Sequence, residues 1–165
     1  MTETRTLSHT GQLLTFVVAG EEFGVDILRV QEIRGWSRPM PLPRTPPYIR
    51  GVINIRGDIV PIADLRERLG LPSLVPGPTT VIVVVRVEHG GRNRTMGFVV
   101  DAMSDVTTIE RDSVKPPPEL ADGGGAGMAS GIALVEQRMI TILDVDRVFP
   151  GLSSAGSTQD GEAAA

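Results

Sequence analysis

Acidic residues near the ends of apolar segments are the side chains best placed to do chemistry in this sequence. Two carboxyl groups held close together can serve as a general acid and a general base, provided that their environments separate their pKa values. An acid/base enzyme is therefore one hypothesis for the chain. The residues concerned are Glu32, Asp58, Asp64, Asp101, Asp105 and Asp144.

Asp64 and Asp144 have a simpler structural interpretation. Each precedes a short segment with helical character, and an aspartate in this position commonly caps a helix by accepting a hydrogen bond from a backbone N–H. We therefore expect structural caps and solvated turn residues instead of a catalytic pair. No catalytic residue is predicted.

Other catalytic and metal-binding chemistry has few candidates. The chain has no Cys and only two His, His9 near the N-terminus and His89 in a predicted turn. It contains no P-loop, no G-x-S-x-G elbow and no G-x-G-x-x-G fingerprint. We expect no metal, no cofactor and no catalytic triad.

Composition narrows the classes of partner. The 165 residues include 16 basic and 20 acidic side chains, for a formal net charge of −4, and only 4% are aromatic. Nucleic-acid-binding modules usually carry clustered basic residues and aromatic stacking platforms. No segment approaches the ~20 apolar residues that span a bilayer. We expect a cytoplasmic protein that neither binds nucleic acid nor inserts into a membrane.

Short runs rich in Val and Ile indicate that strands position these side chains. The runs are bounded by Gly, Pro, Asn or Asp, as strands usually are. Hairpin turns are predicted at 19–22 and 89–93, and Arg56-Gly57-Asp58 is expected at the tip of a third hairpin. Helix is predicted only at 63–70 and 144–149. The predicted strands include 13–18, 52–55, 59–62, 81–85, 98–100 and 139–143.

An internal repeat organises these elements. Residues 51–65 align with 131–145 at a shift of 80, with three identities and seven further pairs of apolar residues. Residues 23–33 align with 96–106 at a shift of 73. This shift is smaller by seven because the second Pro-rich link is longer than the first. Each half thus predicts about five short strands, whose edges a small closed barrel would protect. The sequence predicts an all-β fold of two packed barrels that share apolar residues.

The ends of the chain are poor in apolar residues, so they cannot bury enough surface to offset the entropy of ordering. We expect residues 1–10 to be flexible and residues 151–165 to be disordered. Residues 11–150 are expected to form one domain of two barrels with a groove between them.

Three large side chains lie in or beside the first Pro-rich link: Trp36, Met40 and Tyr48. In one interpretation they project toward a protein partner, as large side chains on a rigid loop often do. In the other they plug the mouth of a barrel. The sequence favours neither interpretation.

Four segments together resemble the CheW family of bacterial chemotaxis coupling proteins. They are residues 23–35, 47–66, 97–106 and 131–148. The most specific part is the Asn-Ile-Arg-Gly turn that ends at residue 57, followed by Val-Pro-Ile-Ala-Asp-Leu. The resemblance extends from about Leu13 to Phe149. It implies two intertwined five-stranded SH3-like barrels, related by internal duplication and carrying short helical turns.

The resemblance also implies a function. Family members are non-enzymatic adaptors that join methyl-accepting chemoreceptors to a CheA-type histidine kinase. It implies that the cytoplasmic tip of a receptor lies in the groove and that the barrels pair with the kinase's regulatory domain, or with further copies of the protein, in array rings. The implied receptor-binding residues are Ile27, Val30, Glu32, Arg56, Val99 and Met103, and the implied kinase-binding residues are Trp36, Arg50, Ile59, Glu119 and Leu120.

Within this set, we expect Glu32 and Arg56 to anchor the receptor's helical tip by charge. Val30, Val99 and Met103 would cover the apolar stripe of that helix. Two alternatives stay open: the same adaptor in a non-flagellar chemosensory pathway that controls pili or second messengers, and, more remotely, the acid/base enzyme.

Overall fold

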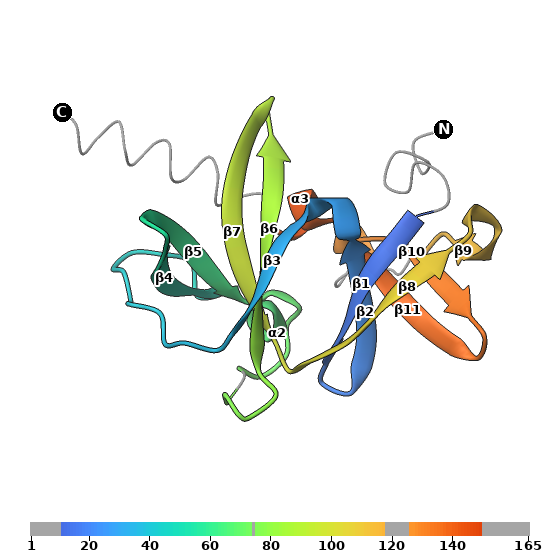
Figure 1. Ribbon diagram of the computed structural model, residues 1–165, viewed down its shortest axis with the longest axis horizontal. Coiled ribbons are helices and arrows are strands. Elements are labelled where there is room, and N and C mark those ends of the chain that lie inside the picture. The colour runs from blue at the N-terminus through green and yellow to red at the C-terminus, as the bar shows by residue number, and fades with distance from the viewer. Residues whose placement is uncertain (1–10, 74, 118–125, 150–165) are drawn as a thin grey trace.

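The computed structural model describes residues 11–73, 75–117 and 126–149, which form two curled β-sheets (Figure 1). Within these residues, no helix combines the length and the hydropathy that crossing a bilayer requires. The strands are β1 (Gly11–Val18), β2 (Glu21–Asp26), β3 (Val30–Gly35), β4 (Ile49–Ile55), β5 (Asp58–Asp64), β6 (Val81–His89), β7 (Arg92–Val100), β8 (Ala102–Ile109), β9 (Val114–Lys115), β10 (Ala129–Val135) and β11 (Arg138–Leu143). The helices are α2 (Leu65–Arg68) and α3 (Val145–Val148), with 3-10 turns η1 (Ile27–Arg29), η2 (Arg111–Ser113) and η3 (Ala126–Met128).

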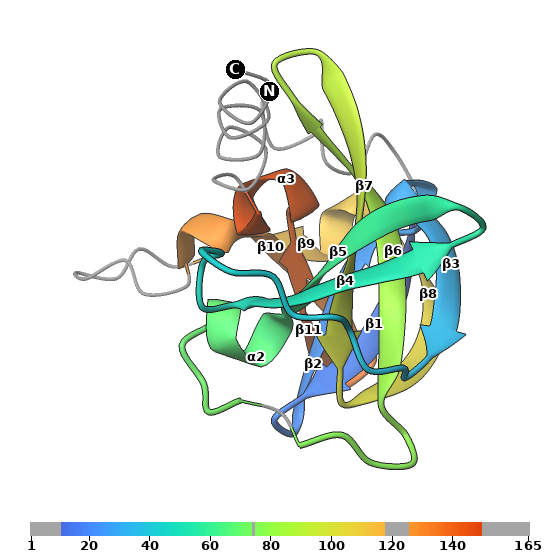
Figure 2. The ribbon, with the colours of Figure 1, turned by 90° about the vertical axis from the view of Figure 1, so that its left-hand side faces the viewer.

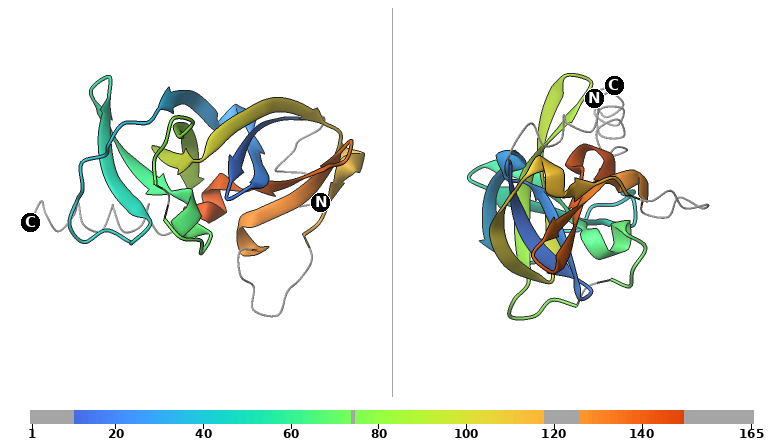
Figure 3. Two further views of the ribbon diagram at one scale, coloured as in Figure 1. Left: turned by 90° about the horizontal axis from the view of Figure 1, so that it is seen from below. Right: turned by 90° about the vertical axis from the view of Figure 1, so that its right-hand side faces the viewer.

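The two sheets exchange hairpins between the two halves of the chain. One sheet, which we call barrel 1, has the strand order β3-β6-β7-β5-β4, and Figure 2 looks onto it. The other, barrel 2, has the order β8-β1-β2-β11-β10-β9 and faces the viewer in the right panel of Figure 3. The β6–β7 hairpin thus completes the barrel of first-half strands, and the β1–β2 hairpin completes the other. The intertwined two-barrel fold is confirmed.

The repeat is also visible in the strand pairing. In barrel 1, Ile62 of β5 pairs in parallel with Gly97 of β7, and in barrel 2, Ile142 of β11 pairs in parallel with Gly24 of β2. These two pairs are equivalent at the shifts of 80 and 73. A Cβ atom on Gly97 would lie 2.8 Å from Cδ1 of Ile62, so the absence of a side chain makes room where strands of the two halves meet.

Each barrel also has a crossing segment that approaches a glycine. Met40 and Val52 exchange two backbone hydrogen bonds of 2.8 and 2.9 Å. A Cβ atom on Gly51 would lie only 2.1 Å from the Met40 carbonyl oxygen. In barrel 2, the short strand β9 pairs with β10 at the equivalent place, beside Gly131. In barrel 1 the crossing segment pairs through one residue, Met40, whereas in barrel 2 it pairs through two and counts as the strand β9. Barrel 2 therefore has six strands where five were expected.

Alternate residues of β6 face two different cores. Val83 and Val85 lie in a core shared by both barrels, whereas Ile82 and Val84 face the interior of barrel 1. A third core fills barrel 2. Because β6 is covered on both faces, its apolar run is unbroken. The predicted sharing of apolar residues between the barrels is confirmed, and the aromatic rings at the centre of the shared core are those of Phe16, Phe98 and Phe149.

Both predicted helical segments form a single turn. The carboxylates of Asp64 and Asp144 accept hydrogen bonds of 3.0 Å from the N–H groups of Arg66 and Asp146. The predicted N-cap roles are therefore confirmed. Helix α2 is shorter than the predicted segment 63–70 because Ala63 and Asp64 continue β5, where they pair with β7.

Two ion pairs join the short helices to the segments that cross between the barrels. The helix supplies the arginine in one pair and the aspartate in the other. Arg66 on α2 pairs with Asp101, between β7 and β8, at 2.6 Å. On the other side, Asp146 on α3 pairs with Arg29 of η1, between β2 and β3, at 2.5 Å. Each carboxylate also accepts a backbone N–H, Asp101 from the β1–β2 turn and Asp146 from β6. The barrels are thus joined by polar contacts as well as by the shared core.

Several predictions fall outside the described residues. They concern the flexibility of residues 1–10, the disorder of residues 151–165, and the kinase-binding roles of Glu119 and Leu120. They stay predictions.

Candidate functional site: two protein-binding surfaces

Glu32 and Arg56, two of the predicted receptor-binding residues, form an ion pair. Arg56 begins the turn between β4 and β5, where its φ of 51° and the 93° of Gly57 form a tight reversal. The carboxylate of Glu32 accepts a hydrogen bond of 2.7 Å from Nη2 of Arg56 and one of 3.1 Å from Arg34. The guanidinium of Arg56, followed by that of Arg34, holds the pKa of Glu32 below its usual value. Glu32 is therefore ionised near neutral pH.

A β-bulge in β3 places two apolar side chains on one face. Val30 pairs with Val85 and Ile33 pairs with Val83, both residues of the shared core. Three positions apart in a regular strand, Val30 and Ile33 would point to opposite faces. The extra residue, Gln31, brings them to the same face. Val30 is partly buried, and Ile33 remains 44% exposed.

Strand β8 repeats this arrangement from the second half of the chain. Met103 pairs with Phe16 and Val106 pairs with Leu14, again residues of the shared core, and Ser104 is the extra residue. Met103 is partly buried, and Val106 is 48% exposed. Strands β3 and β8 are edge strands of the two barrels and lie on the same side of the molecule (Figure 3, left).

We call the set Val30, Ile33, Met103 and Val106 the junction face. Its members are pairwise equivalent at the shift of 73, because 30 + 73 = 103 and 33 + 73 = 106. Sequence analysis found Val30 and Met103 but missed Ile33 and Val106. The repeat aligned the missed residues with each other, but regular strand alternation would place Ile33 opposite Val30 and Val106 opposite Met103.

The two remaining predicted receptor-binding residues differ in accessibility. Ile27 of η1 is partly buried and packs against the shared core beside the junction face. Val99 is only 2% exposed and lies among the interior residues of barrel 1. In this structure its side chain points into the barrel and does not reach the surface, so the predicted contact of Val99 with a partner's apolar stripe stays a prediction that its position does not support.

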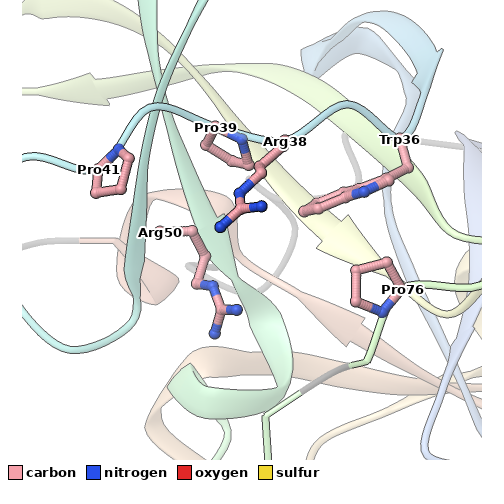
Figure 4. A pocket seen from close by; sticks show the side chains of 6 residues that line it. All are labelled: Trp36, Arg38, Pro39, Pro41, Arg50 and Pro76. Atoms are coloured by element: carbon pink, nitrogen blue, oxygen red, sulfur yellow. The ribbon is translucent and has the colours of Figure 1, made fainter.

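The predicted kinase-binding residues Trp36 and Arg50 line one pocket of about 370 Å³ (Figure 4). Arg50 is the extra residue of a bulge in β4, which redirects its side chain. Its Nη1 donates to the buried carboxylate of Asp64 at 3.4 Å. Ile59 lies on β5, paired with Asn54 near the hairpin tip, and is 64% exposed. The structure brings Trp36 and Arg50 together in the pocket, whereas Ile59 is an exposed apolar side chain that does not line it.

The three large side chains near the Pro-rich link differ in how far they are buried. Trp36 is partly buried against the interior of barrel 1 and also lines the pocket. Met40 is exposed. Tyr48 packs on the shared core near Phe149, with the guanidinium of Arg68 over its ring at 5.3 Å. Met40 therefore projects, whereas Tyr48 fills the core.

Five of the six acidic residues considered for acid/base chemistry accept hydrogen bonds within the fold, and the sixth, Asp58, is exposed. The hydrogen bond from Arg66 holds the pKa of Asp101 below its usual value, despite partial burial. A general acid at neutral pH needs the opposite shift. In the part of the chain that the structure describes, no three His, Asp or Glu side chains gather as a metal-ligand set.

Comparison with known proteins identifies the family. Residues 12–152 match the model of the CheW-like domain. The chain is 40% identical over 139 residues to the chemotaxis protein CheW of Rhizobium meliloti, covering 84% of this chain and 87% of that protein. It is 32% identical over 152 residues to the chemotaxis protein CheW of Bacillus subtilis, covering 92% and 95% of the two proteins.

A solved structure agrees with these relatives. The crystal structure of the scaffolding protein TtCheW from Thermoanaerobacter tengcongensis matches with a TM-score of 0.76 at 31% sequence identity. The match covers 85% of this chain and 92% of that one. With two intertwined barrels of the same arrangement and the sequence identities above, this chain belongs to the CheW-like domain family.

Proposed function

We propose that the protein is a non-catalytic adaptor that holds the tip of a chemoreceptor on its junction face and a CheA-type histidine kinase on barrel 1. The observation that carries the proposal is the presence of two distinct sets of exposed side chains on one pair of interlocked barrels. Family membership supports it, because relatives are named chemotaxis proteins and one is described as a scaffolding protein.

The junction face suits an amphipathic helix. Val30, Ile33, Met103 and Val106 offer apolar surface from two edge strands, and a helix can lay an apolar stripe against such a surface. The ion pair of Glu32 and Arg56 would supply charged groups for polar residues at the helical tip. Arg56 is well placed for this role, because its side chain is 74% exposed while Nη2 contacts Glu32.

The kinase contact is proposed for Trp36, Arg50 and Ile59, with Glu119 and Leu120 contributing a second contact. Trp and Arg are the residue types most often found at the energetic centre of protein interfaces. Exposed Ile59 adds apolar area beyond the pocket. Through the same surfaces, further copies of the protein could join array rings. In this proposal the protein works in the cytoplasm and is recruited to receptor arrays.

Reconstitution tests the proposal. The full-length protein would be mixed with the signalling fragment of a chemoreceptor and the CheA-type kinase from the same organism. We expect the protein to co-sediment with receptor assemblies and to raise receptor-dependent autophosphorylation of the kinase. If it neither binds the receptor fragment nor changes kinase activity, the adaptor role is excluded.

A further inference from the structure

The pocket of barrel 1 combines two guanidinium groups with an apolar wall. Arg38 and Arg50 line it together with Trp36, Pro39, Pro41 and Pro76 (Figure 4). We propose that this pocket binds an acidic side chain, Asp or Glu, of the kinase, next to an apolar residue that packs on Trp36. The inference rests on the proposed kinase contact and adds the chemistry by which the partner is recognised.

The charge of the pocket supports a carboxylate ligand. Neither Asp nor Glu lines it, whereas two of its six lining residues are Arg. In the described part of the chain, the Arg38 side chain makes no ion pair or hydrogen bond. Arg50 has one carboxylate contact, through Nη1 to Asp64 at 3.4 Å. Because Asp64 is only 2% exposed, it cannot itself reach a partner, whereas Arg38 is exposed and the Arg50 side chain is 36% exposed.

Arginine is suited to this task because its planar group can donate two parallel hydrogen bonds to one carboxylate. In Figure 4 the guanidinium of Arg38 points into the pocket between Pro39 and the Trp36 ring. A carboxylate bound there would be shielded from water on one side by the indole and the proline rings, although Arg38 itself is exposed. Shielding strengthens such a charged hydrogen bond relative to one on an open surface.

The backbone on the proline side of the pocket is restrained before any partner arrives. Pro39 and Pro41 flank Met40, whose backbone is fixed to Val52 by two hydrogen bonds, and Gly51 lets the two chains approach. Proline fixes φ, so these residues have little freedom to lose on binding. A surface already held in its bound shape has less entropy to lose when the complex forms.

In the described part of barrel 2, the repeat positions equivalent to Trp36 and Arg50 carry other residue types, so a partner could distinguish the two barrels. At the shifts of the repeat, Ile109 stands at the position of Trp36 and Ser130 at the position of Arg50. Ile109 is buried in the core of barrel 2. An acidic partner segment would therefore choose barrel 1 over barrel 2, although the two share one architecture.

The decisive experiment reverses one charge in the pocket. Binding of the full-length protein to the purified kinase would be measured by calorimetry for the wild type, Arg38→Glu and Arg44→Glu. Arg44 is the matched control, because it is an exposed arginine of the same link that does not line the pocket. We expect Arg38→Glu to weaken binding by roughly tenfold or more, and Arg44→Glu to leave it unchanged. A thermal melt of each variant checks that the fold is retained.

A compensating change identifies the ligand. Exposed Asp and Glu residues of the kinase would be replaced one at a time by Arg, and one replacement should restore binding to Arg38→Glu while weakening binding to the wild type. If the wild type binds and Arg38→Glu binds equally well, the carboxylate pocket is excluded while the kinase contact stands. If the wild type itself does not bind the kinase, the proposed function fails instead.

Discussion

The carboxylate of Glu32 and the guanidinium of Arg56 meet at 2.7 Å although they belong to opposite edges of the barrel 1 sheet. Glu32 lies on edge strand β3, and Arg56 lies on the turn that ends the other edge strand, β4. The pair therefore helps to close the curled sheet. It also presents a charged group beside the junction face, so a structural role and a recognition role coincide in one contact.

Replacing either member of this pair should weaken receptor binding. If both charges contact the receptor tip, Arg56→Ala or Glu32→Ala should cost roughly 1–3 kcal/mol of binding free energy. Titration of each variant with a receptor signalling fragment measures this loss. Arg92→Ala, at the exposed tip of the β6–β7 hairpin, is the control and should bind normally. Unchanged affinity in both variants, with the fold retained, would remove the pair from the receptor site.

A charge on the junction face should disrupt receptor binding without unfolding the protein. The side chains of Ile33 and Val106 are 44% and 48% exposed, so the variants Ile33→Asp and Val106→Asp should fold. In either variant, the new carboxylate would lose water when the apolar stripe of a helix packs on it. Affinity for the receptor fragment should fall roughly tenfold or more in each. Val75→Asp, at an 84% exposed position, should bind like the wild type. Should both junction variants also bind like the wild type, the helix lies elsewhere.

Adding one methyl group at Gly51 should destabilise the fold strongly. Its Cβ would clash with the Met40 carbonyl at a φ of 144°, so the crossing segment or the bulge must move. We expect Gly51→Ala to lower the free energy of unfolding by roughly 2–4 kcal/mol. Gly35→Ala is the matched control, since nothing lies within 4 Å of its Cβ position. Urea unfolding curves compare the two, and equal stability would show that the bridge to Val52 is dispensable.

Stability should depend on the ionised form of Asp101. Because the hydrogen bond from Arg66 lowers the pKa of Asp101 in the folded state below its ordinary 3.8, its contribution is fully present above about pH 4. It is lost as the pH falls through the lower folded-state pKa. Asp101→Asn should therefore be less stable than the wild type by about 1 kcal/mol near pH 7.

This difference should shrink in acid. Urea unfolding at about pH 7 and about pH 3 measures it, and the gap between wild type and Asp101→Asn should narrow as the wild-type carboxyl is protonated. Asp58→Asn, at the exposed first residue of β5, is the control and should match the wild type in stability at both pH values. A gap for Asp101→Asn that is independent of pH would mean that the ion pair does not stabilise the fold.

Local features of this fold could be predicted from the sequence, because their causes are local. The turns at Gly20 and Gly57 and the caps at Asp64 and Asp144 each depend on a few adjacent residues. The repeat also predicted two similar barrels. The residues alone could not show that β1–β2 completes barrel 2, because the same apolar faces would allow each half to close on itself.

The candidate site was harder to predict because it depends on two bulges. Simple alternation places Val30 and Ile33 on opposite faces, and only the extra residue Gln31 reverses this. Alternation also cannot show that Val99 points into the barrel. The last residues of β7 are buried on both faces, so the sequence there does not alternate between apolar and polar residues. In contrast, the family resemblance placed Glu32 and Arg56 in one receptor-binding set although they are 24 residues apart, but the ion pair between them is seen only in the structure.

The exchange of hairpins sets an order of events during synthesis. Hairpin β1–β2 leaves the ribosome first, yet its neighbour β11 ends only at Leu143. Leu13 and Phe16 must therefore wait for most of the chain before they are covered, whereas barrel 1 has all its strands by Val100. When a strand must pair with one that is synthesised much later, folding is slow and apolar surface stays open to other chains. A nascent first half would thus be the form of this protein most prone to swap its hairpin with a neighbour.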